Sequence, residues 1–359
     1  MITPQHNTPQ ILFFSRGQGR GHALPDLAIS EALLQEKPQL DLHFVSYGTG
    51  ADTLRAHGQT ITDLDLPDDN PFIETLVRCL RVLKERKTSL VVTHEEFAAI
   101  VAAKAFNVPS VFLSDWFPRA GTFWFECVAN ATEVIFLDDA GYCDEPPEVT
   151  GKVTYTGTVL RRFSVADQKK EMLKQSHLAL PAGTMVVLVL PGGAAASLEA
   201  NAPLMDLVVG AFDLLHQPQK ALIWVAGTDA SALKAKFANR DDIFVMPPHI
   251  DIERTMLAGD VAITKANRIT TLELSALGVP SISISYGINP IDDSRVARIP
   301  TNEPLRARGL TPAILGDRIT AAYDRGHFLS KVGDNAKHIH AAVTKLLSIL
   351  ESVQGHGKT

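Results

Sequence analysis

The chain has 359 residues, which predicts two domains at roughly 150 residues per domain. Hydrophobic residues make up 45% of the chain and charged residues 21%. This composition is ordinary for a soluble globular protein, and it excludes a disordered, collagen-like or coiled-coil chain. The formal net charge of -6 offers no basic field that would attract nucleic acid, so that class of partner is excluded.

Three cysteines, Cys79, Cys127 and Cys143, lie far apart in the sequence. They form no CxxC pair and no His/Cys cluster, so the pattern predicts neither a zinc site nor a disulfide framework. Reduced cytosol is the simplest compartment for such a chain. The polar segment 1–9 lacks the apolar region of a secretory signal, and no apolar run approaches the roughly 18–20 residues of a spanning helix. We therefore expect a cytoplasmic protein.

Short apolar runs alternate with amphipathic stretches along the first half of the chain. The run at 10–14 predicts a strand, which is followed by a Gly-rich turn and a helix over 23–35. Further strands are predicted at 41–46, 89–93, 110–113, 133–137 and 153–157, with a helix through residue 105 after the strand at 89–93. Strands that alternate with helices predict a parallel sheet with crossover helices, an α/β fold.

The same alternation starts again in the second half. Residues 161–183 are polar and charged, and we interpret them as a linker and the first helix of a second unit. Strands are predicted at 185–190, 221–226, 243–246, 261–264 and 281–285, and a closing helix at 339–350.

The two halves predict two Rossmann-like parallel-sheet domains. The first spans 1–157 and the second 183–335, with a linker and first helix at 158–182 and a closing helix and tail at 336–359. Ligands of such sheets bind outside the carboxyl ends of the strands, so we expect a ligand site in a cleft between the two sheets.

The first Gly-rich turn, Ser15–His22, reads SRGQGRGH. No GK[ST] follows it, and His22 stands where the dinucleotide motif GxGxxG needs a glycine, so nicotinamide and flavin cofactors are disfavoured. What remains is a turn whose backbone N–H groups can approach an anion or a sugar at a helix N-terminus. The helix dipole there favours a neutral His22, the form that a general base requires. A capping histidine in a plain turn is the alternative.

A second Gly-rich turn, LPGGAAAS at 190–197, stands at the start of the second sheet. Taken alone, a tight turn between strand and helix explains it as well as a phosphate cradle does. The helix start at 267–273, NRITTLE, has the Asn and Thr residues of a turn that donates N–H groups to phosphate. Glu273 lies one turn inside this helix, where it could accept from ribose hydroxyls or simply face solvent.

These motifs occur in the order found in one family. The segments Gly17-x-Gly-x-Gly-His22, Gly157-Thr-Val-Leu-Arg161, Pro191-Gly-Gly193 and 249–280 resemble the two-Rossmann-domain (GT-B) glycosyltransferases. The resemblance covers most of the chain. It is strongest to the branch of the peptidoglycan N-acetylglucosaminyltransferase that acts on a lipid-linked acceptor, and the UDP-glycosyltransferases are more distant cousins.

The resemblance implies roles for single residues. His22 would act on the acceptor, oriented by a carboxylate for which Glu95 is the first candidate and Asp115 the second. A capping role at the following helix is the alternative for Glu95. The residues implied in donor binding are Gly19, Gly21, Arg161, Gly192, Gly193, Ile250, Asn267, Arg268, Thr270, Thr271, Glu273, Asp292 and Asp293.

The chain departs from the family pattern at three places. Ala194–Ala196 stand where the family often has Ser or Gln, and Asn267 stands at a family glycine. Asp292 and Asp293 occupy the region where the family has an Asp-Gln or Gln-Gln pair for the sugar hydroxyls. These departures concern the donor sugar more than the donor class.

Three further features have two interpretations each. The aromatic residues at 116–117 and 123–125 could stack on a sugar or an aromatic acceptor, or pack on the core. The basic amphipathic stretch 72–87 could contact an anionic membrane, or be a solvated helix face. Asp63-x-Asp65 matches a metal motif of another transferase class, but it lies far from the expected donor site, and alternation on a solvated face explains it.

The sequence therefore predicts an inverting glycosyltransferase that moves a sugar from a nucleotide donor, most simply a UDP-sugar, to a hydroxyl of a small-molecule or lipid-linked acceptor. No essential metal and no cofactor are expected, because helix N-termini and Arg161 would stabilise the leaving diphosphate. A nucleotide-sugar hydrolase or 2-epimerase is one alternative, and a non-catalytic nucleotide-sugar-binding protein is another. The acceptor and the oligomeric state are left open.

Overall fold

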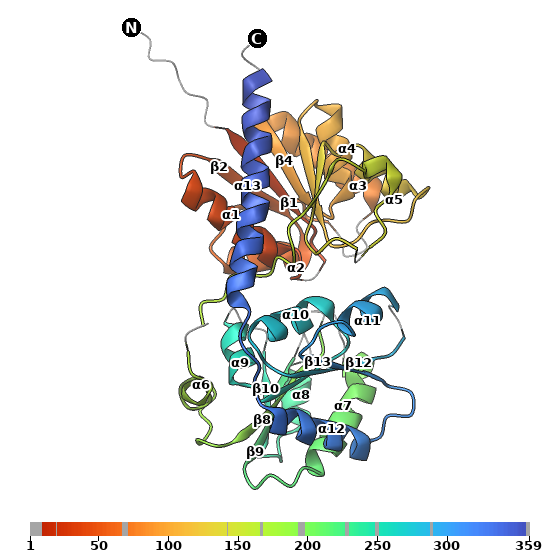
Figure 1. Ribbon diagram of the computed structural model, residues 1–359. Coiled ribbons are helices and arrows are strands. Elements are labelled where there is room, and N and C mark those ends of the chain that lie inside the picture. Colours follow the sequence, from red (N-terminus) through yellow and green to blue (C-terminus); the bar gives the residue numbers. More distant parts are fainter. Residues whose placement is uncertain are drawn as a thin grey trace. The chain divides into compact units, whose positions relative to one another are not determined.

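The computed structural model describes residues 9–18, 20–66, 71–141, 143–165, 168–192, 198–226, 230–247, 251–287 and 290–356. The chain divides into two units (Figure 1). Unit 1 consists of residues 1–162 and 334–359, and unit 2 of residues 163–333. Each unit is built on one parallel sheet, as the sequence predicted.

Seven parallel strands form the sheet of unit 1, in the order β3-β2-β1-β4-β5-β6-β7. Their bounds are β1 Gln10–Ser15, β2 Asp41–Ser46, β3 Ile61–Asp63, β4 Thr88–His94, β5 Ser110–Ser114, β6 Glu133–Phe136 and β7 Val153–Tyr155. The strand order reverses next to β1, which pairs with β2 on one side and with β4 on the other. In such sheets, a crevice for ligands forms at the carboxyl ends of the two strands where the order reverses.

Helices cover both faces of this sheet. They are α1 Ala23–Glu36, α2 Gly48–Ala56, α3 Phe72–Glu85, α4 Phe97–Ala105, α5 Phe123–Ala129, the short η1 Pro147–Val149, and α13 Val332–His356. Alternate residues of β1 enter opposite cores: Phe13 packs with α1 and α13, whereas Phe14 packs with α3 and α4. Because both faces are buried, the strands appear in the sequence as continuous apolar runs.

Helix α13 is longer than the closing helix predicted at 339–350, and it packs on unit 1 rather than on the sheet that precedes it in the chain. Its residues Ile339, Val343 and Leu346 are buried in the same core as α1, and Figure 1 shows the helix running alongside that part of the unit. Apolar periodicity marks only the buried turns of a helix, so the polar turns at its two ends escaped the sequence pattern.

Six parallel strands form the sheet of unit 2, in the order β10-β9-β8-β11-β12-β13. They are β8 Met185–Leu190, β9 Lys220–Val225, β10 Ile243–Met246, β11 Val261–Thr264, β12 Ser281–Ser285 and β13 Asn302–Arg306. The helices are α6 Lys170–Ser176, α7 Leu198–Asp213, α8 Ala230–Lys236, α9 Ile252–Ala258, α10 Arg268–Ala276, α11 Pro290–Val296 and α12 Pro312–Arg325. Here the strand order reverses between β8 and β11.

The sequence pattern missed β13. This strand contains Pro304 and lies at the edge of the sheet, where a residue without an N–H group is tolerated. Within the described ranges, no helix is both long and apolar enough to cross a membrane.

A buried ion pair ties helix α6 to the sheet of unit 2. The Lys174 ammonium lies 2.9 Å from the Asp260 carboxylate, and both side chains are only 3% exposed. Asp260 also accepts a hydrogen bond from the backbone N–H of Val186 at 2.8 Å. Burial alone would lower the pKa of Lys174, but its bonds to Glu171 and Asp260 raise it above the ordinary value.

Replacing Asp260 by Ala should therefore leave a buried ammonium poorly compensated and lower the free energy of unfolding by about 3 kcal/mol. Urea unfolding at neutral pH measures the change. Asp206→Ala is the matched control, because Asp206 is exposed and lies 3.9 Å from Lys236; its effect should stay within about 1 kcal/mol. If the two substitutions lowered the free energy of unfolding equally, Asp260 would not be the carboxylate that compensates the buried ammonium.

Candidate active site

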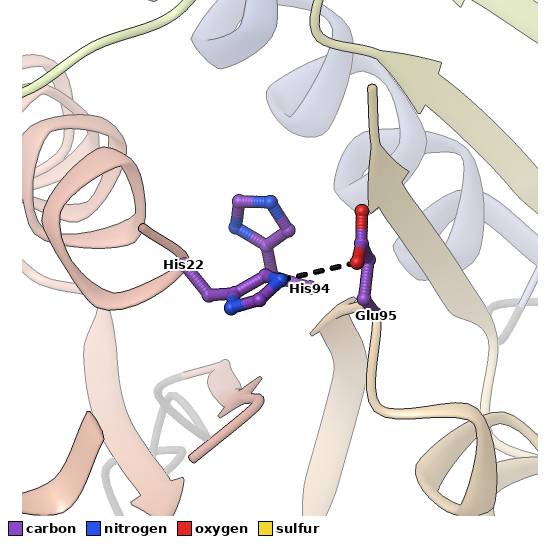
Figure 2. A group of neighbouring side chains, drawn as sticks. All are labelled: His22, His94 and Glu95. Carbon is purple, nitrogen blue, oxygen red and sulfur yellow. Dashed lines mark hydrogen bonds and ion pairs between the residues drawn. The ribbon is translucent and has the colours of Figure 1, made fainter. Parts of the chain in front are cut away.

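His22 and Glu95 meet at the point where the strand order of unit 1 reverses. His22 follows β1 and directly precedes α1, and Glu95 directly follows β4, the neighbour of β1. The two side chains are joined by a hydrogen bond of 3.1 Å between His22 Nε2 and Glu95 Oε2 (Figure 2). Within the described part of the chain, His22 Nδ1 has no hydrogen-bond partner. The sequence predicted this pair, and the structure brings it together.

Glu95 is a buried carboxylate held from several sides. Its Oε1 accepts a hydrogen bond of 2.8 Å from Ser114 at the end of β5, and Arg16 Nη1 lies 3.9 Å from its Oε2. Its backbone is left-handed, with φ of 55°, which costs a non-glycine residue free energy and is found most often at functional sites. The helix cap considered for Glu95 is supplied by Glu96 instead, whose carboxylate accepts from the N–H of Ala98.

The electrostatics of the site keep Glu95 ionised. Burial alone would raise its pKa, but the hydrogen bond and charge of His22, together with the charge of His94, hold the pKa well below the ordinary value of 4.5. Since the carboxylate carries no proton, the N–H of His22 Nε2 donates the bond between them. In the neutral form of His22, this arrangement leaves the lone pair on Nδ1.

A second histidine, His94, supports the first and was not singled out from the sequence. Its ring meets the ring of His22 edge to face, with centroids 4.8 Å apart. Its Nδ1 is bonded at 2.8 Å to Asp26, which in turn accepts a hydrogen bond from Ser15. Burial alone would lower the pKa of His94, but Asp26 raises it. A buried aspartate in the apolar stretch LPDLAIS was the available signal.

Asp115, the second candidate for orienting His22, is half-buried and lies just beyond β5. Its charge acts on His94, whose pKa it helps to raise. Glu95, the first candidate, is the carboxylate that contacts His22.

A pocket of about 320 Å³ opens beside Glu95 within unit 1. Its wall combines aromatic rings with polar groups, and the lining residues are Arg16, Gln18, Phe72, Glu95, Glu96, Phe97, Trp116 and Trp124. The rings pack against one another, with the Phe97 and Trp124 centroids 5.1 Å apart. Residues 123–125 thus belong to helix α5, and the aromatic side chains of 116–117 and 123–124 pack on neighbouring rings. Of these, Trp116 and Trp124 also line the cavity.

Two arginines lie close together near the Gly-rich turn of unit 1. Burial lowers the pKa of Arg20, and the positive charge of Arg161 lowers it further. Arg161 itself is buried. Arg20 was missed in the sequence because a single arginine between glycines carries no motif. Two neighbouring guanidinium groups suit an anionic group such as a phosphate. Gly21 lies between Arg20 and His22, whereas Gly19 lies outside the described residues.

In unit 2, Gly192 and Asn267 meet at the point where the strand order reverses. Gly192 follows β8 with a φ of +73°, and a Cβ on it would lie 2.5 Å from Asn267 Nδ2. The Asn267 side chain caps α10 by accepting from the N–H of Thr270 at 3.2 Å. Ala266, just before it, has a left-handed φ of 51°. A glycine is thus required at 192 for close approach, and the turn before α10 is strained.

The other residues predicted for the donor site take different positions. Thr271 is fully buried, and its hydroxyl donates to the carbonyl of Asn267 at 2.7 Å, so it supports the turn from inside. Arg268 and Glu273 are buried, and Thr270 is half-buried. Asp293 accepts a hydrogen bond from Ser285. Gly193, Ala194–Ala196 and Ile250 lie outside the described residues, as does the side chain of Asp292.

Lys265 is a cation of this region that the sequence analysis missed. It follows β11 directly, its Nζ donates to Asn201 at 3.2 Å, and the ammonium lies 5.6 Å from the centre of the Tyr286 ring. Burial lowers its pKa. A lysine directly after an apolar strand was the available signal. By contrast, Asp63 of the Asp63-x-Asp65 motif is paired with Arg55.

Comparisons with known proteins give three findings. No protein-family model matches the sequence. The chain is 25% identical over 303 residues, 77% of each chain, to the UDP-N-acetylglucosamine--N-acetylmuramyl-(pentapeptide) pyrophosphoryl-undecaprenol N-acetylglucosamine transferase of Carboxydothermus hydrogenoformans. Among solved structures, it is similar to the glycosyltransferase of kitacinnamycin, with a TM-score of 0.71 at 16% identity over 97% of this chain and 99% of that one. It is also similar to the UDP-GlcNAc 2-epimerase of Methanocaldococcus jannaschii, with a TM-score of 0.67 at 11% identity over 95% and 99%.

The two parallel sheets and these neighbours define the class: the chain has the GT-B fold, as the sequence predicted. The curated relatives are transferases of sugar residues, so the predicted enzyme class, a glycosyltransferase, and the predicted resemblance to the peptidoglycan N-acetylglucosaminyltransferase branch are both confirmed.

The Glu95 site has a pH signature. Because the folded-state pKa of Glu95 lies below its ordinary value of 4.5, the ionised carboxylate contributes stability above that pH and loses it as the pH falls toward the folded-state pKa. Glu95→Gln should therefore be less stable than the wild type at about pH 5.5, and this difference in the free energy of unfolding should narrow in more acidic solution. Urea unfolding over a pH series below about pH 5.5 measures the difference, and a difference that widens over that range would contradict a lowered pKa of Glu95.

Proposed function

We propose that the protein transfers a sugar from a UDP-sugar to an acceptor hydroxyl with inversion at the anomeric carbon, and that the His22–Glu95 pair performs the proton transfer. The observation that carries this proposal is the hydrogen-bonded pair at the place where a doubly wound sheet binds ligands. The UDP-linked donor named for the curated relatives supports the choice of donor.

The base in this proposal is His22 Nδ1. Glu95 holds the ring in the tautomer that carries its proton on Nε2, and it stabilises the imidazolium that forms when Nδ1 takes the proton of the acceptor hydroxyl. The hydroxyl oxygen then attacks the anomeric carbon as the bond to the diphosphate breaks. Nδ1 is covered by protein atoms, so we expect the Gly-rich turn before His22 to shift when the acceptor binds.

The donor belongs to unit 2 in this proposal. The first N–H groups of α10 and the ammonium of Lys265 would neutralise the diphosphate, and Glu273 would accept from the ribose. Helix N-termini and fixed cations stabilise a leaving diphosphate without a metal ion, so we propose a reaction that needs no cofactor. In unit 1, the Arg20–Arg161 pair suits an anionic group of a substrate.

The acceptor belongs to the pocket beside Glu95. Its aromatic wall, formed in part by Trp116 and Trp124, can stack on a ring or an apolar chain of the acceptor. The same wall leads to the exposed side chains of Ile73 on α3 and Phe123 on α5. Exposed basic residues lie nearby in the sequence: Arg81 and Lys84 on α3, and Lys87 just after it. Contact of the stretch 72–87 with an anionic membrane, for a lipid-linked acceptor, is part of this proposal, as is a cytoplasmic location.

Replacing His22 by Ala should lower kcat for sugar transfer by roughly 10²- to 10⁴-fold, the size of a general-base contribution, and leave the affinity for the UDP-sugar within about twofold. Product formation from UDP-GlcNAc with a panel of acceptors gives kcat, and calorimetry gives the affinity. His340→Gln is the control, since His340 forms an exposed pair with Glu36. Near-normal turnover of folded His22→Ala would refute the base assignment.

The same assay separates the second candidate function. Structural similarity to a UDP-GlcNAc 2-epimerase favours a reaction of the donor alone. A 2-epimerase or hydrolase would convert UDP-GlcNAc without any acceptor, whereas a transferase should release UDP in proportion to glycosylated acceptor. Binding of UDP-GlcNAc without turnover on any acceptor would indicate a non-catalytic binding protein.

Trp124→Ala should raise the KM for the acceptor about fivefold, because stacking on an aromatic side chain contributes roughly 1 kcal/mol, and leave the KM for the donor unchanged. Steady-state kinetics with each substrate varied in turn measures both constants. Phe106→Ala is the control: Phe106 is a comparably exposed aromatic residue in unit 1 that does not line the pocket. If Trp124→Ala changed only the KM for the donor, the proposal that the acceptor binds in this pocket would be wrong.

A further inference from the structure

His22, His94 and Glu95 bring two imidazoles and one carboxylate to one point of unit 1 (Figure 2). Each residue offers one metal-ligating atom, and the three atoms lie within 4.8 Å of one another. Two histidines and a glutamate are the protein ligands of zinc sites that keep one coordination position open. We propose that this cluster binds a Zn²⁺ ion and that the bound ion inhibits sugar transfer.

His94 is held in the way that metal-binding histidines usually are. Its Nδ1 is bonded at 2.8 Å to Asp26, a carboxylate that is 1% exposed and is itself bonded to Ser15. Such a carboxylate fixes the ring orientation and leaves Nε2 as the ligating atom. The carboxylate of Asp26 is thus bonded to His94 and Ser15, whereas the carboxylate of Glu95 is bonded to His22 and Ser114.

Glu95 and His22 already have the spacing of two ligands on one ion. The 3.1 Å between His22 Nε2 and Glu95 Oε2 compares with roughly 3.3 Å between neighbouring ligands of a tetrahedral ion with bonds of about 2.0–2.1 Å. Ser114 anchors the other oxygen of Glu95 at 2.8 Å, as an outer-shell partner does. Closing the site therefore requires only a small approach of the two imidazole rings.

The pocket beside Glu95 gives the ion access to the site and leaves space for a fourth ligand. Glu95 lines the pocket of about 320 Å³, so a water molecule can complete the coordination from that side. The site differs in this respect from Asp63-x-Asp65, where Asp63 is paired with Arg55 and Asp65 is almost fully exposed.

Inhibition follows from the tautomer of His22, and this step rests on the proposed function. A metal ion on Nε2 needs the lone pair of that nitrogen, so the ring proton then resides on Nδ1. Nδ1 can no longer accept the proton of the acceptor hydroxyl, and Glu95 is drawn to the ion instead of to the imidazole. Zinc is thus an inhibitor at this site and plays no part in the reaction.

Metal binding is measured on the full chain, without reference to activity. Titration of the metal-free protein with ZnCl₂ in a calorimeter should show one ion per chain, and Co²⁺ should give the visible absorption of a four-coordinate site. His94→Gln, which removes a ligand, and Glu95→Gln should each weaken binding at least ~10-fold, with folding checked by circular dichroism. His340→Gln, the exposed His–Glu pair, should bind as the wild type does. Absence of binding, or equal binding by wild type and both ligand variants, would overturn the site.

Transfer assays then test inhibition. Zn²⁺ should inhibit the wild type at concentrations close to the calorimetric Kd, and EDTA should restore the rate. His94→Gln should need at least ~10-fold more Zn²⁺ for half-inhibition, relative to its own zinc-free rate. Transfer that persists with the site saturated would overturn the inhibitory role. If the protein binds zinc through this cluster but transfers no sugar, the proposed function fails while the metal site stands.

Discussion

The carboxylate of Glu95 imposes the constraint on which the candidate site of unit 1 depends. A buried anion needs hydrogen-bond donors or positive charges close to it. At the end of β4, Ser114 from the next strand, His22 from the neighbouring turn and Arg16 supply them to the Glu95 carboxylate. The left-handed backbone at Glu95 is the cost of turning the side chain toward these partners. The orientation of His22, and with it the nitrogen that can act as a base, follows from that one charge.

The two units share the same arrangement of turns at the point where the strand order reverses. Each places a glycine-containing turn after its first central strand and a second turn after the neighbouring strand, and in each the second turn holds a non-glycine residue in the left-handed region, Glu95 in unit 1 and Ala266 in unit 2. The chemistry differs: unit 1 gathers titratable side chains, whereas unit 2 presents a capped helix and Lys265.

Most of the fold was predictable because buried parallel strands appear as apolar runs. The strands at 10–14 and 185–190 were found to within one residue. The His22–Glu95 pair was expected from the family resemblance, and the two side chains do form a hydrogen bond. The elements and residues that the sequence pattern did not predict were missed for physical reasons. β13 contains a proline and few apolar residues, because an edge strand is only partly covered. His94 and Lys265 belong to no local motif, since their partners Asp26 and Asn201 lie more than 60 residues away in sequence.

Helix α13 has a consequence for the order in which the protein is made. It completes the core of unit 1 although it follows all of unit 2 in the sequence, and Asn335 binds it to the backbone at Leu160 and Arg161. A ribosome therefore synthesises all of unit 2 before α13 can join the core of unit 1. Unit 2 can fold during that interval, whereas unit 1, with the proposed base, becomes complete only once α13 has been made.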